Sequence, residues 1–218
     1  MGLLIMKCLV LANGEYGDDL KTYNELVDKA DCIICADGGA NYAYQLQLVP
    51  DCIIGDMDSI AGEVRDYFNR LEVPVKKYPR QKDFTDTQLA LSEAEARGAD
   101  EIVLIGSLGK RLDHTLSNLY SCMDLAERGI KVSHHAPEMQ VHLVTDELRL
   151  KGGAGDLVSV LVLSDRATGV SEEGFEYPLQ KAVLAKGNPF AVSNLMVGED
   201  ATITVDEGVL AVFHYHRR

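Results

Sequence analysis

The pattern of apolar residues changes near Pro137, and this change constrains the fold more than any other feature of the sequence. Before Pro137, short β-branched runs alternate with stretches whose apolar residues recur at helical spacing, which is typical of a parallel sheet flanked by helices. We predict strands at residues 7–12, 32–36, 52–55, 75–78, 101–106 and 131–135. Thr85 and Gln88 have the spacing of a capping box, so a helix is expected to begin there.

After Pro137, strand-like runs follow one another without helical patterns between them. They cover residues 140–144, 148–150, 157–163, 201–205 and 209–215, separated by turn segments such as KGGAGD. This pattern predicts a small antiparallel sandwich or barrel. We therefore expect a Rossmann-like parallel α/β domain over residues 1–136, followed by a small antiparallel β-sandwich over residues 137–218.

Charge and composition exclude several classes of function. A formal net charge of −13 without a basic run argues against nucleic-acid binding. No apolar stretch reaches the roughly 18 residues that span a bilayer, so we expect no membrane association. Five cysteines, an odd number and mostly in apolar runs, suit a reducing cytoplasm. An acidic protein that handles phosphates needs an added cation, most simply a divalent metal ion.

Polar side chains follow four of the predicted strands. They lie in residues 37–40 (DGGA), 55–59 (GDMDS), 82–86 (KDFTD) and 106–114 (GSLGKRLDH). In open parallel sheets, ligands bind outside the carboxyl ends of the strands. One aspartate after one strand is also explained as a helix cap or turn residue. Four such loops at one edge favour a shared site for a metal ion and phosphates.

Carboxylates dominate two of these loops. Asp56 and Asp58 are two residues apart in a turn, so both could face Mg²⁺, which prefers oxygen ligands. Asp83 and Asp86 add two carboxylates beside Lys82, and like charges are costly to gather unless a cation neutralises them. The pattern therefore predicts a magnesium site at this edge.

The loop at 106–114 supplies positive charge. Lys110 and Arg111 lie beside glycines, where backbone amides can approach an anion at the start of a helix. The segment is not a P-loop, because Leu104 stands at the position of the first glycine and Arg111 at that of the Ser or Thr. His114 either joins the site or hydrogen-bonds locally and orients Asp113.

The other histidines receive a structural interpretation. His134 and His135 adjoin on a predicted strand and face opposite ways, so a metal pair is not expected there. His142, His214 and His216 fall in alternating strand patterns, and we expect partly buried or edge residues.

In this order, the motifs resemble those of the thiamine pyrophosphokinase family, whose members convert thiamine and ATP to thiamine diphosphate and AMP. The matching segments are DGGAN at 37–41, GDMDS at 55–59, KDFTDTQLAL at 82–91, GSLGKRLDHTLSN at 106–118, TGVS at 168–171, YPL at 177–179 and VSN at 192–194. The resemblance implies that the α/β domain binds ATP and that the β-sandwich binds thiamine. It also implies a homodimer with thiamine held between subunits.

The resemblance completes the set of candidate site residues. The candidates for catalysis are Asp56, Asp58, Asp83, Asp86 and Arg111, of which the first three are candidates for Mg²⁺. The candidates for ATP are Asp37, Gly38, Ser59, Lys82, Thr85, Gly109, Arg111, Asp113 and His114. Those for thiamine are Ser193 and Asn194.

The chain departs from the family pattern at two positions. Lys110 replaces a common glycine, and Leu195 stands where many members have an acidic residue. Two other functions stay open at this stage. A haloacid-dehalogenase-like phosphatase also uses an Asp-x-Asp pair after a strand, although it places the pair near the first strand. A non-catalytic sensor of nucleotide or thiamine could keep the fold without turnover.

Overall fold

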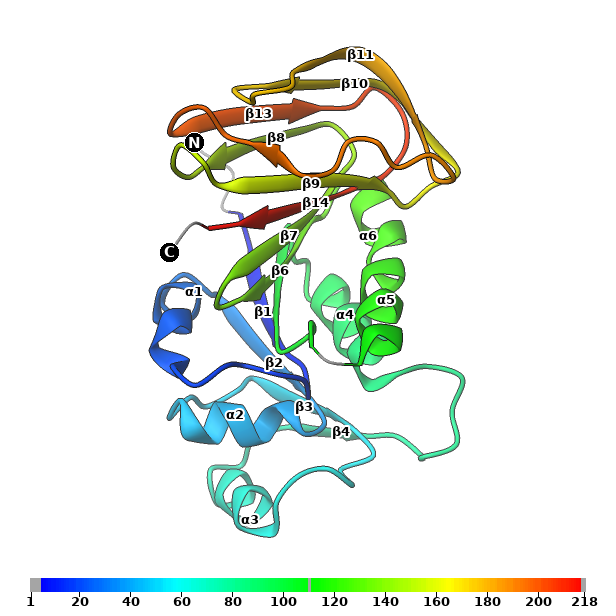
Figure 1. Cartoon of the computed structure of the whole chain (residues 1–218). Helices are drawn as coiled ribbons and strands as arrows, with labels where there is room; N and C mark the ends of the chain where they lie inside the picture. Colours follow the sequence, from blue (N-terminus) through cyan, green and yellow to red (C-terminus); the bar gives the residue numbers. More distant parts are fainter. Residues whose placement is uncertain (1–4, 110, 217–218) are drawn as a thin grey trace. The chain divides into compact units, whose positions relative to one another are not determined.

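The computed structural model describes residues 5–109 and 111–216, and shows two compact units (Figure 1). One unit contains the residues up to Ser121 together with His134–Pro137, and the other contains Cys122–Ser133 and the residues from Glu138 onward. The expectations that concern Lys110 lie outside the described residues.

The first unit is built on a parallel sheet. Its strand order is β6-β5-β1-β2-β3-β4. The neighbouring strands from β5 to β4 in this order all pair in parallel. The strands are β1 (Lys7–Leu11), β2 (Cys32–Ala36), β3 (Cys52–Gly55), β4 (Val75–Lys77), β5 (Glu101–Ile105) and β6 (Lys131–Ala136), of which the last begins in the second unit and ends in the first. Strands β1, β2, β3 and β5 are apolar runs buried on both faces, as expected when helices cover a parallel sheet.

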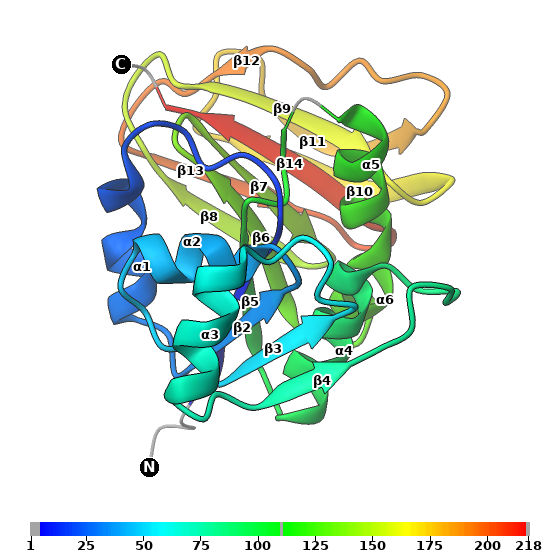
Figure 2. The same ribbon diagram turned by 90° about the horizontal axis from the view of Figure 1, so that it is seen from below.

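Helices cover both faces of this sheet. The helical elements are η1 (Leu20–Tyr23), α1 (Asn24–Asp28), α2 (Gly39–Gln45), α3 (Gly62–Arg70), α4 (Asp86–Ala96) and α5 (Leu112–Ser121). Figure 2 shows α2 and α3 on one face of the sheet and α4 on the other. The predicted capping box is present at α4, where Thr85 Oγ1 accepts from Gln88 N and Gln88 Oε1 accepts from Thr85 N.

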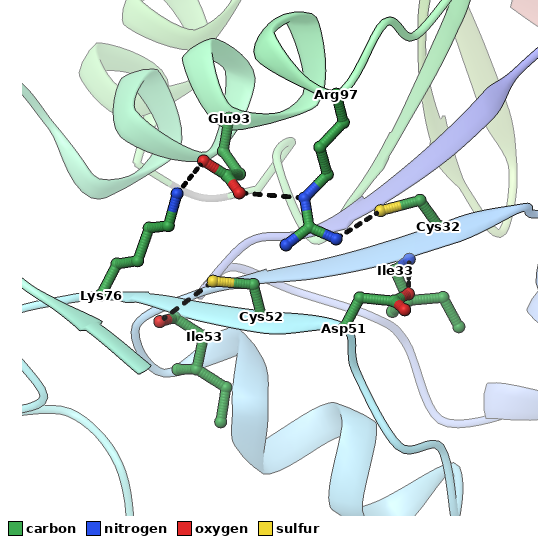
Figure 3. Close-up of polar contacts among 8 residues, drawn as sticks. All are labelled: Cys32, Ile33, Asp51, Cys52, Ile53, Lys76, Glu93 and Arg97. Carbon is green, nitrogen blue, oxygen red and sulfur yellow. Dashed lines mark hydrogen bonds and ion pairs between the residues drawn. The ribbon is translucent and has the colours of Figure 1, made fainter. Parts of the chain in front are cut away.

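A charged cluster fastens α4 to the sheet (Figure 3). Glu93 of α4 pairs with Lys76 Nζ of β4 at 2.5 Å and with Arg97 Nε at 2.9 Å. Arg97 in turn donates to Cys32 Sγ of β2 at 3.5 Å. All five cysteines are buried free thiols, so the CxxC at Cys32 and Cys35 forms no disulfide.

The second unit contains two antiparallel sheets that enclose an apolar core. The strand orders are β12-β9-β14-β7 and β11-β10-β13-β8. The elements are α6 (Met123–Glu127), β7 (Met139–Val144), β8 (Glu147–Lys151), β9 (Leu157–Val162), β10 (Arg166–Glu173), β11 (Leu179–Ala185), β12 (Asn194–Leu195), β13 (Asp200–Thr204) and β14 (Leu210–Tyr215). Val160 and Val212 of one sheet share a core with Val170 and Ile203 of the other. The predicted fold class, a parallel α/β sheet followed by an antiparallel β-sandwich, is confirmed.

The sequence patterns missed β10, β11 and the two-residue β12. Strand β10 pairs with shifts of register between Ala167 and Val170 and again between Val170 and Glu172, so its apolar residues do not alternate regularly. Strand β11 is the edge of its sheet, and most of its residues are exposed or half-buried. Among the described residues, no helix is long and apolar enough to cross a membrane.

Two glycines that begin helices provide a matched test of the packing around the sheet. A Cβ added to Gly39 of α2 would lie 2.0 Å from the carbonyl oxygen of Leu11, whereas one added to Gly62 of α3 would meet nothing within 4 Å. We expect Gly39→Ala to lower the free energy of unfolding by about 2 kcal/mol or more. Gly62→Ala should leave it unchanged or raise it by up to about 1 kcal/mol. Urea unfolding measures both, and equal stability of the two variants would contradict the close approach.

Candidate active site

A pocket of about 850 Å³ lies in the first unit, where the loops after the parallel strands meet. Strands β1, β2, β3, β4 and β5 are each followed by residues that line it. The loops predicted to converge at this edge therefore share one cavity, as the rule for open parallel sheets anticipates.

Three carboxylates gather on one side of this pocket. One oxygen each from Asp37, Asp56 and Asp86 lies within 4.8 Å of the others. Asp37 is 5% exposed, and its Oδ1 has no hydrogen-bond partner within the described part of the chain. Burial, together with the charges of Asp86 and Asp56, raises the pKa of Asp37, although Ser59 and the Gly38 amide act in the opposite direction. A cation between these oxygens would relieve that cost.

Gly55 at the end of β3 makes this gathering possible. Its φ is 149°, and a Cβ added there would lie 2.9 Å from both Asp37 Cβ and Asp86 Oδ1. Any larger residue would therefore push Asp37 and Asp86 apart.

Asn41 of α2 holds the GDMDS loop in place. Its Nδ2 donates to the carbonyl of Ser59 at 2.9 Å, and its Oδ1 accepts from Ala61 N at 2.9 Å. Within the loop, Asp58 N donates to Asp56 Oδ1 at 3.1 Å, and Ser59 Oγ donates to Asp58 Oδ1 at 3.0 Å. The loop thus turns Asp56 towards Asp37, while Asp58 is exposed.

Cationic side chains complete the pocket. Lys82 Nζ lies 2.8 Å from Asp86 Oδ1, and the Lys82 side chain is only 9% exposed, so its charge is held at a fixed place. Arg80 Nε lies 3.6 Å from Asp58 Oδ2 at the exposed rim. Buried and exposed cations therefore both face the cavity.

Arg111 forms a bidentate salt bridge with Asp113. Arg111 Nε donates to Asp113 Oδ1 at 3.0 Å, and its Nη2 donates to Oδ2 at 2.5 Å. This pairing lowers the pKa of Asp113 to about 2. Because both side chains are well exposed, the pair orients the guanidinium and contributes little to stability.

Helix α5 fixes the loop that precedes it. Gly109 N donates to Thr115 Oγ1 at 3.2 Å, and Asn118 Nδ2 donates to the Ser107 carbonyl at 2.7 Å. Ser107 Oγ lies 2.8 Å from His134 Nδ1 of β6. The hydroxyl and the carbonyl of Ser107 thus both have polar partners. The Gly109 N–H is bonded to a side chain of α5.

Most of the predicted site residues line this pocket. They are Asp37, Asp56, Asp58, Ser59, Lys82, Thr85, Asp86, Gly109, Arg111, Asp113 and His114. Gly38 and Asp83 are absent from its lining, and Asp83 is exposed. Sequence reasoning missed Arg80 and the loop after β1, which contributes Asn13, Gly14 and Glu15. The polar run after the first strand was the signal that could have identified this loop.

A smaller pocket of about 250 Å³ lies in the second unit. Its lining consists of Glu172, Tyr177, Leu179, Phe190, Ala191, Val192, Ser193 and Asn194, so it contains both residues predicted for thiamine. Tyr177, Phe190 and Val192 are largely exposed.

Glu172 is buried in this second pocket, with 1% of the residue exposed. Its Oε2 accepts from Asn194 Nδ2 at 2.9 Å, whereas Oε1 has no hydrogen-bond partner among the described residues. Burial raises the pKa of Glu172, and the hydrogen bond from Asn194 opposes that rise. Asn194 also bonds both the N–H and the carbonyl of Tyr177. Sequence reasoning missed Glu172, because the strand that carries it, β10, was itself not predicted.

Two family models match the chain. "Thiamin pyrophosphokinase, catalytic domain" matches residues 23–134, and "Thiamin pyrophosphokinase, vitamin B1 binding domain" matches residues 142–210. The chain belongs to the thiamine pyrophosphokinase family. This is a family of diphosphotransferases that use ATP as the co-substrate.

Relatives agree with this assignment to the thiamine pyrophosphokinase family. The chain is 26% identical to thiamine pyrophosphokinase 1 of Oryza sativa subsp. japonica, with 85% of this chain and 79% of the relative covered. It is 25% identical to thiamine pyrophosphokinase of Bacillus subtilis, with 81% and 84% covered. The crystal structure of Bacillus subtilis thiamine pyrophosphokinase has a TM-score of 0.86 and 21% identity, and covers 97% of this chain and 100% of that one. This last likeness supports the fold.

The two pockets lie in the two regions that the thiamine pyrophosphokinase models distinguish. The carboxylate pocket is lined largely from the region matched by the catalytic model, although its β1 loop precedes that region. The whole lining of the smaller pocket lies within the region matched by the vitamin B1 binding model.

Proposed function

We propose that this chain transfers the pyrophosphoryl group of ATP to the hydroxyl of thiamine, giving thiamine diphosphate and AMP. The observation that carries the proposal is the gathering of Asp37, Asp56 and Asp86 beside Lys82 in the large pocket. Such a site suits a polyphosphate that arrives with a divalent cation. We assign ATP binding to residues 1–136 and thiamine binding to residues 137–218.

The donor set of the large pocket fits Mg²⁺. It offers only carboxylate oxygens, and the unpartnered Oδ1 of buried Asp37 gains a partner when a cation is present. We propose that Asp37, Asp56 and Asp86 hold the ion, whereas the sequence alone favoured Asp56, Asp58 and Asp83. When bound, Mg²⁺ neutralises phosphate charge and helps to fix the phosphates for reaction.

In the proposed reaction, the thiamine hydroxyl oxygen bonds to the β-phosphorus of ATP. The bond from that phosphorus to the oxygen bridging the α- and β-phosphates breaks, and AMP leaves with that oxygen. Lys82 and Arg111 provide positive charge for the phosphates, Lys82 from a buried position and Arg111 with the orientation set by Asp113. A carboxylate that lines the pocket accepts the hydroxyl proton, and Asp83 lies outside that lining.

The smaller pocket suits the acceptor. Thiamine carries a cationic thiazolium ring, and Glu172 offers a buried carboxylate with one oxygen unpartnered in the described chain. Tyr177 and Phe190 present aromatic surface at the rim, where cation–π contact is possible. We propose that Glu172 joins Ser193 and Asn194 in holding thiamine.

The exposed apolar rim also supports assembly. Tyr177, Phe190 and Val192 are 71%, 51% and 43% exposed, and neighbouring exposed apolar side chains are typical of an interaction surface. We propose a homodimer with thiamine held between subunits.

The five buried free thiols support a cytoplasmic location.

Product identity tests the reaction directly. The protein is incubated with ATP, Mg²⁺ and thiamine, and the products are separated by chromatography. We expect AMP and thiamine diphosphate in equal amounts. ADP with thiamine monophosphate would indicate transfer of a single phosphoryl group. In a parallel incubation with a phosphomonoester, release of inorganic phosphate would support a phosphatase. Tight binding of ATP or thiamine without turnover would support a sensor.

Asp86 and Asp83 form a matched pair for the carboxylate site. Asp86→Asn removes a carboxylate that faces both Lys82 and the other two aspartates, so we expect kcat to fall at least about 100-fold. Asp83→Asn makes the same chemical change at an exposed position outside the pocket, and kcat should stay within about threefold. Steady-state kinetics and a check of folding by circular dichroism distinguish the variants. A large decrease in kcat for Asp83→Asn would show that this exposed aspartate also takes part in the reaction, contrary to the assignment.

Glu172 and Glu173 form a second pair, because they are adjacent on β10 and only Glu172 is buried in the pocket. Glu172→Gln keeps the shape of the side chain but removes the charge that faces the thiazolium. We expect the KM for thiamine to rise at least about tenfold, with the KM for ATP changed less than about twofold. Glu173→Gln should change neither constant. Unaltered thiamine kinetics in Glu172→Gln would exclude this role even if the product assay succeeds.

A further inference from the structure

A second group of potential metal ligands lies in the second unit, around the end of β14. One ligand atom each from Asp156, His214 and His216 lies within 4.8 Å of the others. His214 Nε2 is 3.0 Å and His216 Nδ1 is 3.6 Å from the same oxygen, Asp156 Oδ2. All three residues belong to the second unit, and none of them lines either pocket.

The strand and the turn that carry these residues explain how they meet. His214 and His216 are two positions apart at the end of β14, so their side chains emerge on one side, with ring centroids 4.2 Å apart. Asp156 ends the KGGAGD turn before β9 and is 5% exposed. Its Oδ2 also accepts from Gly153 N at 3.1 Å, which fixes the carboxylate.

The backbone of Gly152 packs closely against the cluster. A Cβ added there would lie 2.5 Å from Asp156 Oδ2 and 3.0 Å from His214 Nε2. The His216 side chain is 41% exposed, which leaves a route from solvent to the buried Asp156 and His214. The cluster therefore combines two buried ligands, a neighbouring position that admits only glycine, and one side open to solvent.

We propose that Asp156, His214 and His216 form a binding site for a zinc-like transition-metal ion. Zinc bonds to nitrogen and carboxylate oxygen at about 2.0–2.1 Å in tetrahedral sites, which places ligand atoms about 3.3 Å apart. The distances of 3.0 and 3.6 Å to Asp156 Oδ2 bracket that separation. Two imidazoles and one carboxylate favour Zn²⁺ over Mg²⁺, and three protein ligands leave a fourth position for water.

A hydrogen bond between Asp156 and His214 alone accounts for less of this arrangement. Such a bond does not require a second imidazole, His216, to lie 3.6 Å from the same oxygen. The hydrogen bond from Gly153 to Asp156 is the kind of outer contact that orients a metal-binding carboxylate. A bound ion would join the turn before β9 to the end of β14, and would stabilise the second unit independently of the proposed reaction.

Exposed His216 allows a test that leaves the buried residues intact. Full-length wild type, His216→Ala and His142→Ala are prepared free of metal and titrated with Zn²⁺ or Co²⁺ in excess Mg²⁺, which occupies carboxylate-only sites. His142 is a control because it lies on β7 and bonds to Gln140. We expect one Zn²⁺ per chain in wild type and His142→Ala, and an affinity at least about tenfold weaker in His216→Ala. Bound Co²⁺ should show the intense visible absorption of four-coordinate cobalt.

Thermal unfolding gives a readout that is independent of metal counting. At a hundredfold excess over its Kd, Zn²⁺ should raise the unfolding midpoint of wild type by about 5 °C, and that of His216→Ala by much less. Asp156→Asn, which preserves size, should also lose the shift. Equal Zn²⁺ affinity in wild type and His216→Ala, or Co²⁺ spectra without four-coordinate character, would overturn the proposal.

Discussion

Repulsion among three carboxylates is the constraint on which the arrangement of the first unit depends. Asp37 and Asp56 follow β2 and β3, whereas Asp86 begins α4, and each carboxylate would be more favourably solvated apart. Gly55 permits their approach, and Lys82 offsets part of their charge from a position almost closed to solvent. Asp37 Oδ1 has no hydrogen-bond partner among the described residues, so the described groups compensate the negative charge of the three carboxylates only in part. A site held in this state favours a ligand that brings positive charge with it.

Rigid contacts between loops hold that constraint in place. Tyr16 donates from its hydroxyl to the carbonyl of Ala12 at 2.8 Å and stacks on Tyr42 of α2 at 3.7 Å. Burial raises the pKa of Tyr16 well above its ordinary value, so the hydroxyl stays a donor. Asn41 ties α2 to the loop after β3 in the same way. Helix α2, which begins at Gly39, therefore positions both the loop after β1 and the loop after β3. The close packing of α2 against the sheet thus helps to fix the positions of the carboxylates.

The fold class and most of the pocket could be predicted from the sequence, because they depend on periodicity and on loop position. Buried apolar strands, the capping box at Thr85 and the loops after β2, β3 and β5 all have local signals. Which carboxylates meet is not a local property. Asp56 and Asp58 are equivalent in sequence, and only the turn held by Asn41 directs Asp56 inward. Irregular pairing concealed β10, and with it the burial of Glu172.

A buried carboxylate without a full set of partners also occurs in the second unit, at Glu172. In the function proposed above, the carboxylates of the first unit bind a cation that accompanies an anionic substrate, whereas Glu172 faces a substrate that is itself cationic. Asn194 bonds one oxygen of Glu172 and both backbone groups of Tyr177, so it fixes the carboxylate relative to the aromatic rim. Leu195 stands where the resemblance places an acidic residue in many family members, and its N–H donates to Asn194 Oδ1. Glu172 supplies a negative charge to this pocket from β10, and that charge does not depend on the residue at position 195.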